Sequence, residues 1–400
     1  MKPNLTLLAL LLFTHTIINA QETKAPSFGK GLFNLVGKDS LWTMKIGARM
    51  QFLSISKWDD VSGNFNNTET NFLVRRARLK LDGFAYTPKL KYKIELGLSN
   101  NDISGASEYT SNAPRYILDA VVKWNFAPNL ELWFGQTKLP GNRERLISSG
   151  NLQFVDRSLL NSQFNIDRDL GLQLRHHFKV SETFLVKEAF ALSKGEGRNV
   201  TSKNFGGHQY TTRLELLPFG DFKDQGDYVG GDLSREKTPK LALGFTYDFN
   251  NNAVKTKSNQ GSYMLTDDGF FETNISTIFI DAMFKYQGLS VMAEYASRDA
   301  THPTAKNTDG SLTGDLVQIG KGLNLQTGYV FKSNWEVSGR YTSIALNQII
   351  TAKTPKNQYT LGVSKYIVGH KLKVQSDISY LEGMNTANQL MYRLQFDIHF

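Results

Sequence analysis

The last nine residues, YRLQFDIHF at positions 392–400, alternate strictly between apolar and polar side chains. The apolar set begins at Tyr392 and ends at Phe400, and polar residues such as Arg393 and Asp397 fill the positions between. A period of two is the period of a β-strand, whose successive side chains point to opposite faces. The segment therefore predicts a strand with one apolar and one wet face. The chain stops there, with no charged tail.

The opposite end of the chain carries a short apolar run. Lys2 is followed by a nine-residue apolar stretch over 5–13 and by small residues up to Ala20. This order is typical of a secretory signal peptide over residues 1–20. The alternative is a membrane-anchoring helix, which needs about 20 apolar residues, and no later stretch reaches that length. An exported chain without spanning helices is either a soluble secreted protein or a closed barrel.

Composition favours the barrel. Aromatic residues make up 12% of the chain although the mean hydropathy is −0.34, which suits strands that alternate lipid-facing and lumen-facing residues. The absence of cysteine excludes disulfides, thiolate metal sites and a lipid-anchoring cysteine. The net charge of +9 is compatible with nucleic acid, lipopolysaccharide or small anions as partners, and does not choose among them.

Alternating segments recur along the whole chain, separated by turn-forming residues. They predict an all-β fold, a transmembrane antiparallel up-and-down β-barrel, with a signal peptide over 1–20, a periplasmic lead segment over 21–40 and the barrel over 41–400. The sixteen predicted strands are 41–56, 71–86, 91–101, 116–126, 130–138, 168–178, 183–193, 210–218, 239–249, 275–286, 289–300, 320–331, 335–347, 358–367, 370–380 and 387–400.

The connections alternate in length as well. Short turns follow most even-numbered strands, which is the pattern of an outer-membrane barrel and not of a Greek-key sandwich. One connection on the short side, 219–238, is long and rich in Gly and Asp. Either that turn is elaborated, or the count is fourteen or eighteen strands. The long connections follow odd-numbered strands and are 57–70, 102–115, 139–167, 194–209, 250–274 and 301–319.

Six short motifs follow one another along the chain: IGARMQ at 46–51, FLVRRARL at 72–79, GQTKLP at 135–140, LISS at 146–149, DRS at 156–158 and RDLG at 168–171. In their order and spacing they resemble the phosphate-selective porin O and P family. Asp156 stands where that family's pattern has Glu, a mild departure. The resemblance extends over essentially the whole mature chain.

The resemblance implies a sixteen-stranded porin of the bacterial outer membrane, commonly a homotrimer, that passes small anions such as phosphate. The closing strand, ending at Phe400, resembles the strand by which outer-membrane barrels are inserted. It implies the barrel assembly machinery as a partner, besides outer-membrane lipid and lipopolysaccharide.

Alternation also predicts which residues face the lumen. If the last strand pairs with the first, the strands predicted at 370–380, 387–400, 41–56, 71–86 and 91–101 form one continuous wall. Ten inward cations on this wall face only four acids, so we expect a positive track for anions. The ten are Lys45, Arg49, Arg76, Arg78, Lys80, Lys91, Lys93, Lys371, Lys373 and Arg393. A mixed lumen with little net field is the alternative.

The connection 139–167 is a second candidate for the anion pathway. A loop of this length is unusual unless it is functional or disordered, and this one is too apolar to extend into water. We expect it to fold into the lumen and narrow the pore, with Arg143, Arg145 and Arg157 near the constriction. The alternative is an outer loop packed on the rim or on a neighbouring subunit.

Motifs for catalysis are missing. The sequence contains neither G-x-S-x-G nor H-E-x-x-H. The cations predicted to point inward argue against nucleic acid, which needs an exposed basic face. We therefore expect no enzyme activity, no metal and no cofactor. Three hypotheses remain: an anion-preferring porin, a general non-selective porin, and a hydrolase or adhesin built on a barrel.

Overall fold

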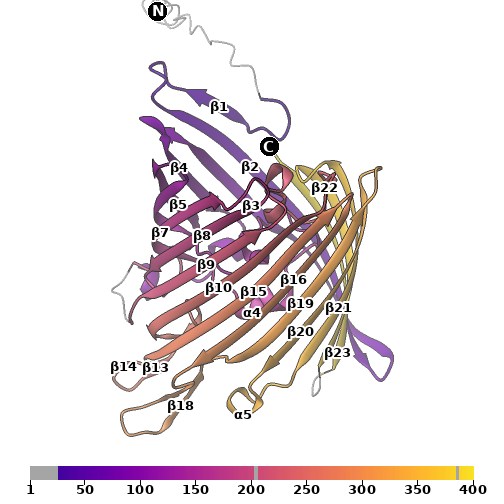
Figure 1. The fold of residues 1–400 in the computed structure, drawn as a ribbon. Coiled ribbons are helices and arrows are strands. Elements are labelled where there is room, and N and C mark those ends of the chain that lie inside the picture. The colour runs from indigo at the N-terminus through magenta and orange to yellow at the C-terminus, as the bar shows by residue number, and fades with distance from the viewer. Residues whose placement is uncertain (1–25, 202–205, 384–386) are drawn as a thin grey trace, which may run out of the picture.

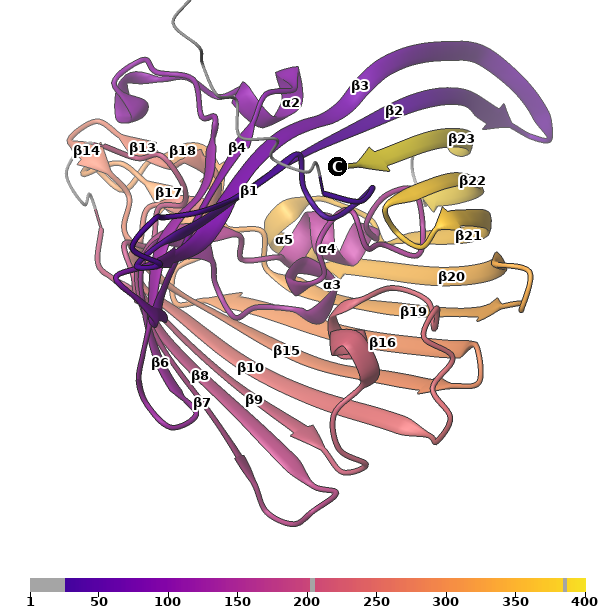
Figure 2. The ribbon, with the colours of Figure 1, turned by 90° about the horizontal axis from the view of Figure 1, so that it is seen from above.

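The computed structural model describes residues 26–201, 206–383 and 387–400, so the predicted signal peptide lies outside the described residues. In these ranges sixteen antiparallel strands form a closed barrel (Figures 1 and 2). Each predicted strand overlaps one of them. The strands are β2 (Thr43–Val61), β3 (Asn64–Ala85), β4 (Thr87–Gly97), β5 (Ile117–Ala127), β6 (Leu130–Lys138), β7 (Arg168–Lys179), β8 (Leu185–Ser193), β9 (Gln209–Leu217), β10 (Lys240–Ala253), β15 (Thr273–Tyr286), β16 (Leu289–Ala300), β19 (Gly320–Val330), β20 (Trp335–Leu346), β21 (Lys356–Val368), β22 (Leu372–Gly383) and β23 (Asn388–His399).

The connections between the barrel strands contain short helices and short hairpins. Six are helical: α2 (Asn100–Ile103), η1 (Glu108–Thr110), α3 (Arg143–Leu146), α4 (Leu159–Phe164), η2 (Lys223–Tyr228) and α5 (Gln348–Thr351). Small hairpins in the long loops comprise β11 (Lys255–Lys257), β12 (Gln260–Tyr263), β13 (Leu265–Thr266), β14 (Gly269–Phe270), β17 (Thr304–Lys306) and β18 (Leu312–Leu316). None of the helices in the described ranges is long and apolar enough to cross a membrane.

The barrel closes where the last strand meets the first. Along β2, Gln51 pairs with Asp397 and Phe52 pairs with Phe396 of β23. The phenylalanines are 45% and 40% exposed on the outer face, whereas Gln51 and Asp397 are buried and joined by a 2.6 Å hydrogen bond. The alternation of the closing strand therefore separates a lipid face from a lumen face, as the sequence predicts.

The described part of the lead segment lies against this seam. The short strand β1 (Phe33–Val36) pairs with the start of β2 beyond the end of β23. The ring of Phe28 packs edge-on against Phe400, with centroids 6.0 Å apart. Residues before position 26 lie outside the described ranges.

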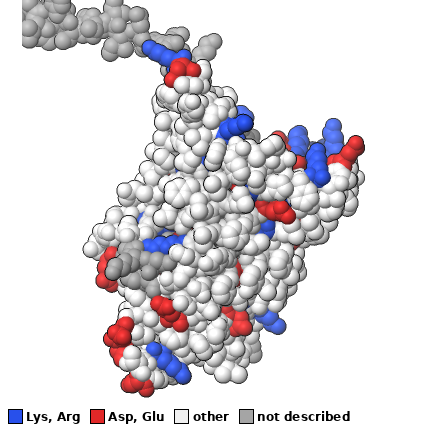
Figure 3. Space-filling view, turned by 60° about the vertical axis from the view of Figure 1, so that its left-hand side comes forward, with Lys and Arg blue, Asp and Glu red and all other residues white. Residues whose placement is uncertain are grey.

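The outer wall is mainly uncharged. Figure 3 shows few charged side chains over the middle of the visible face, and more of them toward the end with the long loops and toward the opposite end. Outward residues such as Leu172, Leu174 and Phe190 are 40–45% exposed to the surroundings. An apolar band between charged ends is what the bilayer requires of a barrel wall.

The two ends of the barrel differ as predicted, with one correction. Short turns and both described chain ends lie at the upper end in Figure 1, and the long loops lie at the lower end. The predicted long loop 57–70 is wrong, because β2 and β3 continue as one hairpin that turns at Ser62 and Gly63. Both turn residues have positive φ, 55° and 86°, which is the two-residue geometry that fits twisted strands.

The connection 219–238 is an elaborated turn and not a sign of a different strand count. It contains η2 and lies at the short-turn end between β9 and β10. Those two strands still pair directly over eight residue pairs, from Leu243 opposite Leu216 to Asn250 opposite Gln209. The sixteen-strand count therefore holds, and fourteen and eighteen are excluded.

Candidate functional site

The segment 139–167 lies inside the barrel, and Figure 2 shows α3 and α4 within the ring of strands. Its apolar side chains pack on inward-facing apolar residues of the wall. Phe164 joins a buried cluster with Phe279, and Ile147 joins another with Met283. Full burial of one such side chain contributes about 1.5–3 kcal/mol. The segment is thus held as a packed element inside the lumen.

Arg143 holds the first half of the segment. Its side chain is fully buried, and its Nε donates to Asp281 at 2.7 Å while Nη2 lies 3.4 Å from Glu215. Arg213 of β9 binds the same two acids, at 2.7 Å and 2.6 Å. Two guanidinium groups thus meet two carboxylates. Because this cluster is balanced and buried, Arg143 serves to anchor the segment on β9 and β15.

Asp156 ties the segment to the opposite wall through two consecutive arginines. Arg76 pairs with Gln51 of β2, but the next pair skips Arg75. This bulge turns both arginines inward. Arg75 donates to Asp156 at 2.7 Å and Arg76 at 3.1 Å. Burial alone would raise the pKa of Asp156, but Arg76 and Arg75 outweigh it and hold that pKa well below its usual range.

Further contacts fasten the middle of the segment to the wall that runs from β16 to β23. Lys373 of β22 donates to the carbonyl of Leu152 at 3.0 Å. The amide of Gln153 donates to Glu336 of β20 at 2.6 Å. Because the wall supplies partners for backbone and side chains alike, this side of the lumen is filled.

A second insertion enters from the short-turn end. In the connection 219–238, the hydroxyl of Tyr228 donates to Glu215, the acid that Arg143 also approaches. The backbone amide of Gly230 donates to the carbonyl of Asn151 at 2.7 Å. The two insertions therefore meet inside the barrel, and together they occupy the part of the lumen next to β9 and β15.

Open space remains against β3 to β9, where residues of the two insertions also line it. Two cavities adjoin there, one of 270 Å³ and one of 700 Å³. We refer to them together as the channel. The residues that line both cavities mark their junction: Lys123, Trp133, Leu146, Arg175 and Tyr228.

The smaller cavity is strongly basic. Its lining includes only two acids, Glu95 and Asp119, among the described residues. Both acids are shared between cations: Lys93 lies 2.7 Å from Glu95 and 2.5 Å from Asp119. The lining cations number eight: Arg78, Lys93, Lys123, Lys138, Arg145, Arg157, Arg168 and Arg175.

The basic lining continues to the short-turn end of the barrel. A neighbouring cavity of 350 Å³ shares Lys93 and Lys123 with the channel and is also lined by Lys80 and Lys91. Lys80 pairs with Asp82 at 2.9 Å and keeps 46% of its side chain exposed. A solute that leaves the smaller cavity on this side therefore meets lysines.

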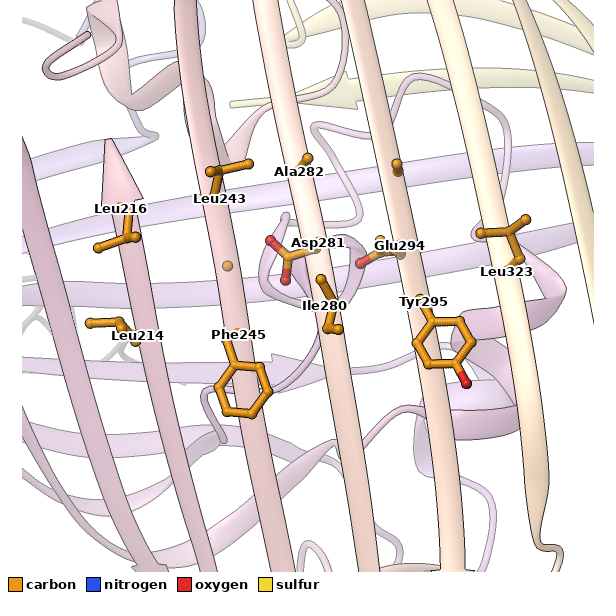
Figure 4. A pocket seen from close by; sticks show the side chains of 12 residues that line it. Leu214, Leu216, Leu243, Phe245, Ile280, Asp281, Ala282, Glu294, Tyr295 and Leu323 are labelled. Carbon is orange, nitrogen blue, oxygen red and sulfur yellow. The ribbon is translucent and has the colours of Figure 1, made fainter. Parts of the chain in front are cut away.

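A different hollow, of 390 Å³, lies on the outer wall and not in the channel (Figure 4). Ala282 and Ala293 face each other across β15 and β16, and larger outward side chains such as Phe245 and Tyr295 surround them. The hollow is apolar and faces the membrane. It belongs to the lipid face and carries no pore chemistry.

Comparison with known proteins agrees with this geometry. The family model of the phosphate-selective porin O and P matches residues 45–396. The chain belongs to this family. A protein of Aquifex aeolicus (strain VF5), named as uncharacterized, is 23% identical over 390 residues, which cover 89% of this chain and 86% of that protein.

Solved outer-membrane proteins share the fold of this porin. An anion-selective porin from Comamonas acidovorans has a TM-score of 0.54 at 11% identity, covering 90% of this chain and 100% of that chain. The outer-membrane channel DcaP of Acinetobacter baumannii has a TM-score of 0.51 at 11% identity, covering 92% and 100%. At such identities the likeness shows the fold alone, and it agrees with an outer-membrane porin.

The ten predicted wall cations of the porin occupy different places. Arg78 and Lys93 line the channel, and Lys80 and Lys91 line the cavity at the short-turn end. Four others lie beneath the segment 139–167 or pair with wall acids, as Arg393 does with Asp377 at 2.7 and 2.9 Å. These four are Arg49, Arg76, Lys373 and Arg393.

Lys45 and Lys371 lie together at the short-turn end. Gly31 and Gly29 approach their side chains from the lead segment. Burial lowers the pKa of Lys371, and repulsion from nearby cations, Lys45 first among them, lowers it further. The two lysines are therefore close to each other and at a distance from the smaller cavity, whose lining includes neither.

The three predicted arginines of the segment also separate. Arg145 and Arg157 line the channel, whereas Arg143 is buried against β9 and β15. Arg145 donates to Asp167 at 2.7 Å. Arg157 donates to the carbonyls of Glu144 and Ile147, and burial lowers its pKa well below the usual value.

Several channel residues were not predicted from the sequence. Alternation along β5 to β7 could have found most of them, because Lys123 lies between the outward residues Val122 and Trp124, and Arg175 follows the outward Leu174. Trp133 gives no such signal, since an aromatic residue is expected on the lipid side. Arg75 was hidden by the bulge, which breaks the alternation. The unpredicted lining cations are Lys123, Lys138, Arg168 and Arg175.

Proposed function

We propose that this porin lets small anions cross the outer membrane by passive diffusion, with oxyanions of the phosphate or polyphosphate class as its solutes. The observation that carries the proposal is the lining of the smaller cavity, in which eight cations stand against two acids. The larger cavity, by contrast, is lined by four Lys or Arg and six Asp or Glu side chains. A cleft lined by one sign of charge and enclosed by low-dielectric walls concentrates counter-ions. Guanidinium groups suit phosphate because their planar fork binds two oxygens at once.

A general, non-selective porin is the second candidate. Ion pairs inside the channel favour it, because Arg78, Lys93 and Arg168 share Glu95 and Asp119 at 2.5–3.0 Å. Such pairing weakens the net field that a passing ion meets. Membership of a porin family favours either pore over a barrel-based hydrolase or adhesin, for which a bilayer carrying the protein would stay closed.

Charge reversal near the short-turn end tests the proposal without disturbing the inserted segment. Lys80→Glu combined with Lys91→Glu places two acids in the cavity that continues the channel. We expect this variant to lose much of the anion preference in a planar bilayer under a salt gradient.

The matched control is Lys306→Glu combined with Lys356→Glu, two exposed lysines at the long-loop end. It changes the net charge by the same amount and should leave the reversal potential near that of the wild type. Equal effects of the two variants would contradict the proposal, because a bulk charge effect would then explain both.

The resemblance to the family also predicts a homotrimer, insertion by the barrel assembly machinery and contacts with lipopolysaccharide. These three remain predictions. The trimer is tested by native mass spectrometry of protein extracted in mild detergent.

A further inference from the structure

The eight cations of the smaller cavity differ in the groups that their charges contact. Four of them form ion pairs with carboxylates, and two donate to backbone carbonyls. Among the described residues, Lys123 and Arg175 form no ion pair. The paired four are Arg78, Lys93, Arg145 and Arg168, and the two that donate to carbonyls are Lys138 and Arg157.

Lys123 and Arg175 are both held by one indole ring. The Nζ of Lys123 lies 3.6 Å from the centroid of Trp133, and the Cζ of Arg175 lies 4.2 Å from it. Lys123 comes from β5, directly opposite Trp133 of β6, and Arg175 comes from β7 on the other side. Two cations this close to one centroid fit only on opposite faces of the ring.

Neighbouring groups fix this arrangement. The indole Nε1 of Trp133 donates to Glu131 at 2.8 Å, which sets the plane of the ring. The guanidinium of Arg175 donates twice to the side-chain oxygen of Gln173, at 3.2 and 2.9 Å. Glu131 accepts from the edge of the ring and itself lines the larger cavity. Among the ion pairs of the described residues, none joins Glu131 to Lys123 or Arg175.

An aromatic face holds a cation without cancelling its charge. The attraction comes from the ring quadrupole, so the formal charge remains, whereas a carboxylate at the same distance would neutralise it. Lys123, Trp133 and Arg175 all line both cavities of the channel. A solute that passes between the cavities must therefore pass these two charges.

We propose that Lys123 and Arg175 form an anion-binding pair at the junction of the two cavities, and that Trp133 is the positioning residue that holds them there. The ligand class is a small inorganic oxyanion such as phosphate. The inference rests on the proposed anion conduction and assigns its selectivity to residues outside the wall that the sequence predicts.

The test uses the full-length porin in planar bilayers, with two readouts. One is the anion-to-cation permeability ratio in potassium chloride, and the other is the block of chloride current by added inorganic phosphate. We expect Trp133→Leu to lower both about two- to fivefold, the factor expected when a cation loses its aromatic partner. Trp133→Phe keeps an aromatic face and should retain most of both.

The matched control is Trp124→Leu, because Trp124 lies on the neighbouring strand with its ring 49% exposed on the outer face. It should leave both readouts unchanged. Lys123→Gln and Arg175→Gln should each lower the readouts in the wild type and do much less in Trp133→Leu, since the ring acts through these cations. Heat-modifiable migration on gels shows that each variant is folded.

Two results would overturn the inference. One is a folded Trp133→Leu that keeps the wild-type permeability ratio and phosphate block. The other is an undiminished effect of Lys123→Gln and Arg175→Gln in that background. Absence of anion preference in the wild type is a distinct outcome, because it would contradict the proposed function itself.

Discussion

Asp156 accepts hydrogen bonds from Arg75 and Arg76 of β3, at 2.7 and 3.1 Å, and so joins the inserted segment to the barrel wall. Lys123 and Arg175, by contrast, form no ion pair among the described residues and lie instead on the ring of Trp133. At the scale of single residues, cations of this porin therefore act either as anchors or as free charges. The group that a Lys or Arg side chain contacts decides which of these two roles it has, and the choice between Lys and Arg does not.

The anchoring role of Asp156 predicts a large effect of removing its charge. Asp156→Asn leaves two partly buried guanidinium groups without their acid, which costs about 3 kcal/mol in the attachment of the segment. We expect larger and noisier single-channel conductance. Asp156→Glu, which restores the acid that the family pattern has at this position, should behave like the wild type. An Asp156→Asn channel with the conductance and current noise of the wild type would show that the contact of Asp156 with Arg75 and Arg76 does not hold the segment.

The pKa of Asp156 predicts how the channel responds to pH. Because this pKa is held below its unfolded value of about 3.9, the carboxylate stabilises the docked segment fully above that pH and loses its effect as pH falls through the folded pKa. Asp156 should therefore add no pH dependence to the conductance between about pH 8 and pH 5, and its protonation should change the conductance only below about pH 4. A transition between pH 5 and 7 that Asp156→Asn abolishes would contradict this assignment.

Residue roles were harder to predict than residue faces. Alternation correctly turns Arg78 and Lys93 inward, but it cannot tell that Arg393 is neutralised by Asp377, its direct partner on the neighbouring strand β22. It fails outright at Arg75, where a bulge adds one residue to β3. Ion pairs and bulges depend on cross-strand register, which the pattern of one strand does not contain.

At the scale of elements, the inserted segment 139–167 behaves as a small core inside the barrel. Its helix α4 places Phe164 among buried residues from β8, β15, β16 and β20. Arg298 of β16 donates to the carbonyl of Phe164 at 2.7 Å, which caps the end of that helix. The apolar composition of the segment predicted burial. The wall that it covers was not predictable, since contacts between distant elements leave no local pattern.

Phe164→Ala should loosen this element. Removing a fully buried phenylalanine costs about 3–5 kcal/mol of the packing that holds the segment, so we expect a wider channel with higher conductance in a barrel that remains folded. Phe72→Ala is the matched control, because Phe72 is 78% exposed on β3. Thermal unfolding and conductance of both variants check the prediction, and equal conductance would contradict it.

At the scale of the whole molecule, period-two alternation predicted sixteen strands, their order and the closing strand. It worked because the bilayer imposes an apolar outer face on every strand. The hairpin of β2 and β3 extends beyond the part of the wall on which the bilayer imposes this alternation. Its exposed, polar turn was therefore predicted as a loop. The lumen is shaped instead by two insertions, one from each end, which leave a channel beside β3 to β9 whose smaller cavity is basic.

The most direct measurement is the reversal potential of the wild-type porin in a planar bilayer under a potassium chloride gradient. The basic smaller cavity of the channel predicts a potential of the anion-selective sign at about 0.1 M salt. Its size should fall toward zero near 1 M, because the screening length drops from about 10 Å to about 3 Å. A potential of the cation-selective sign, or none at low salt, would contradict the account and leave a general porin.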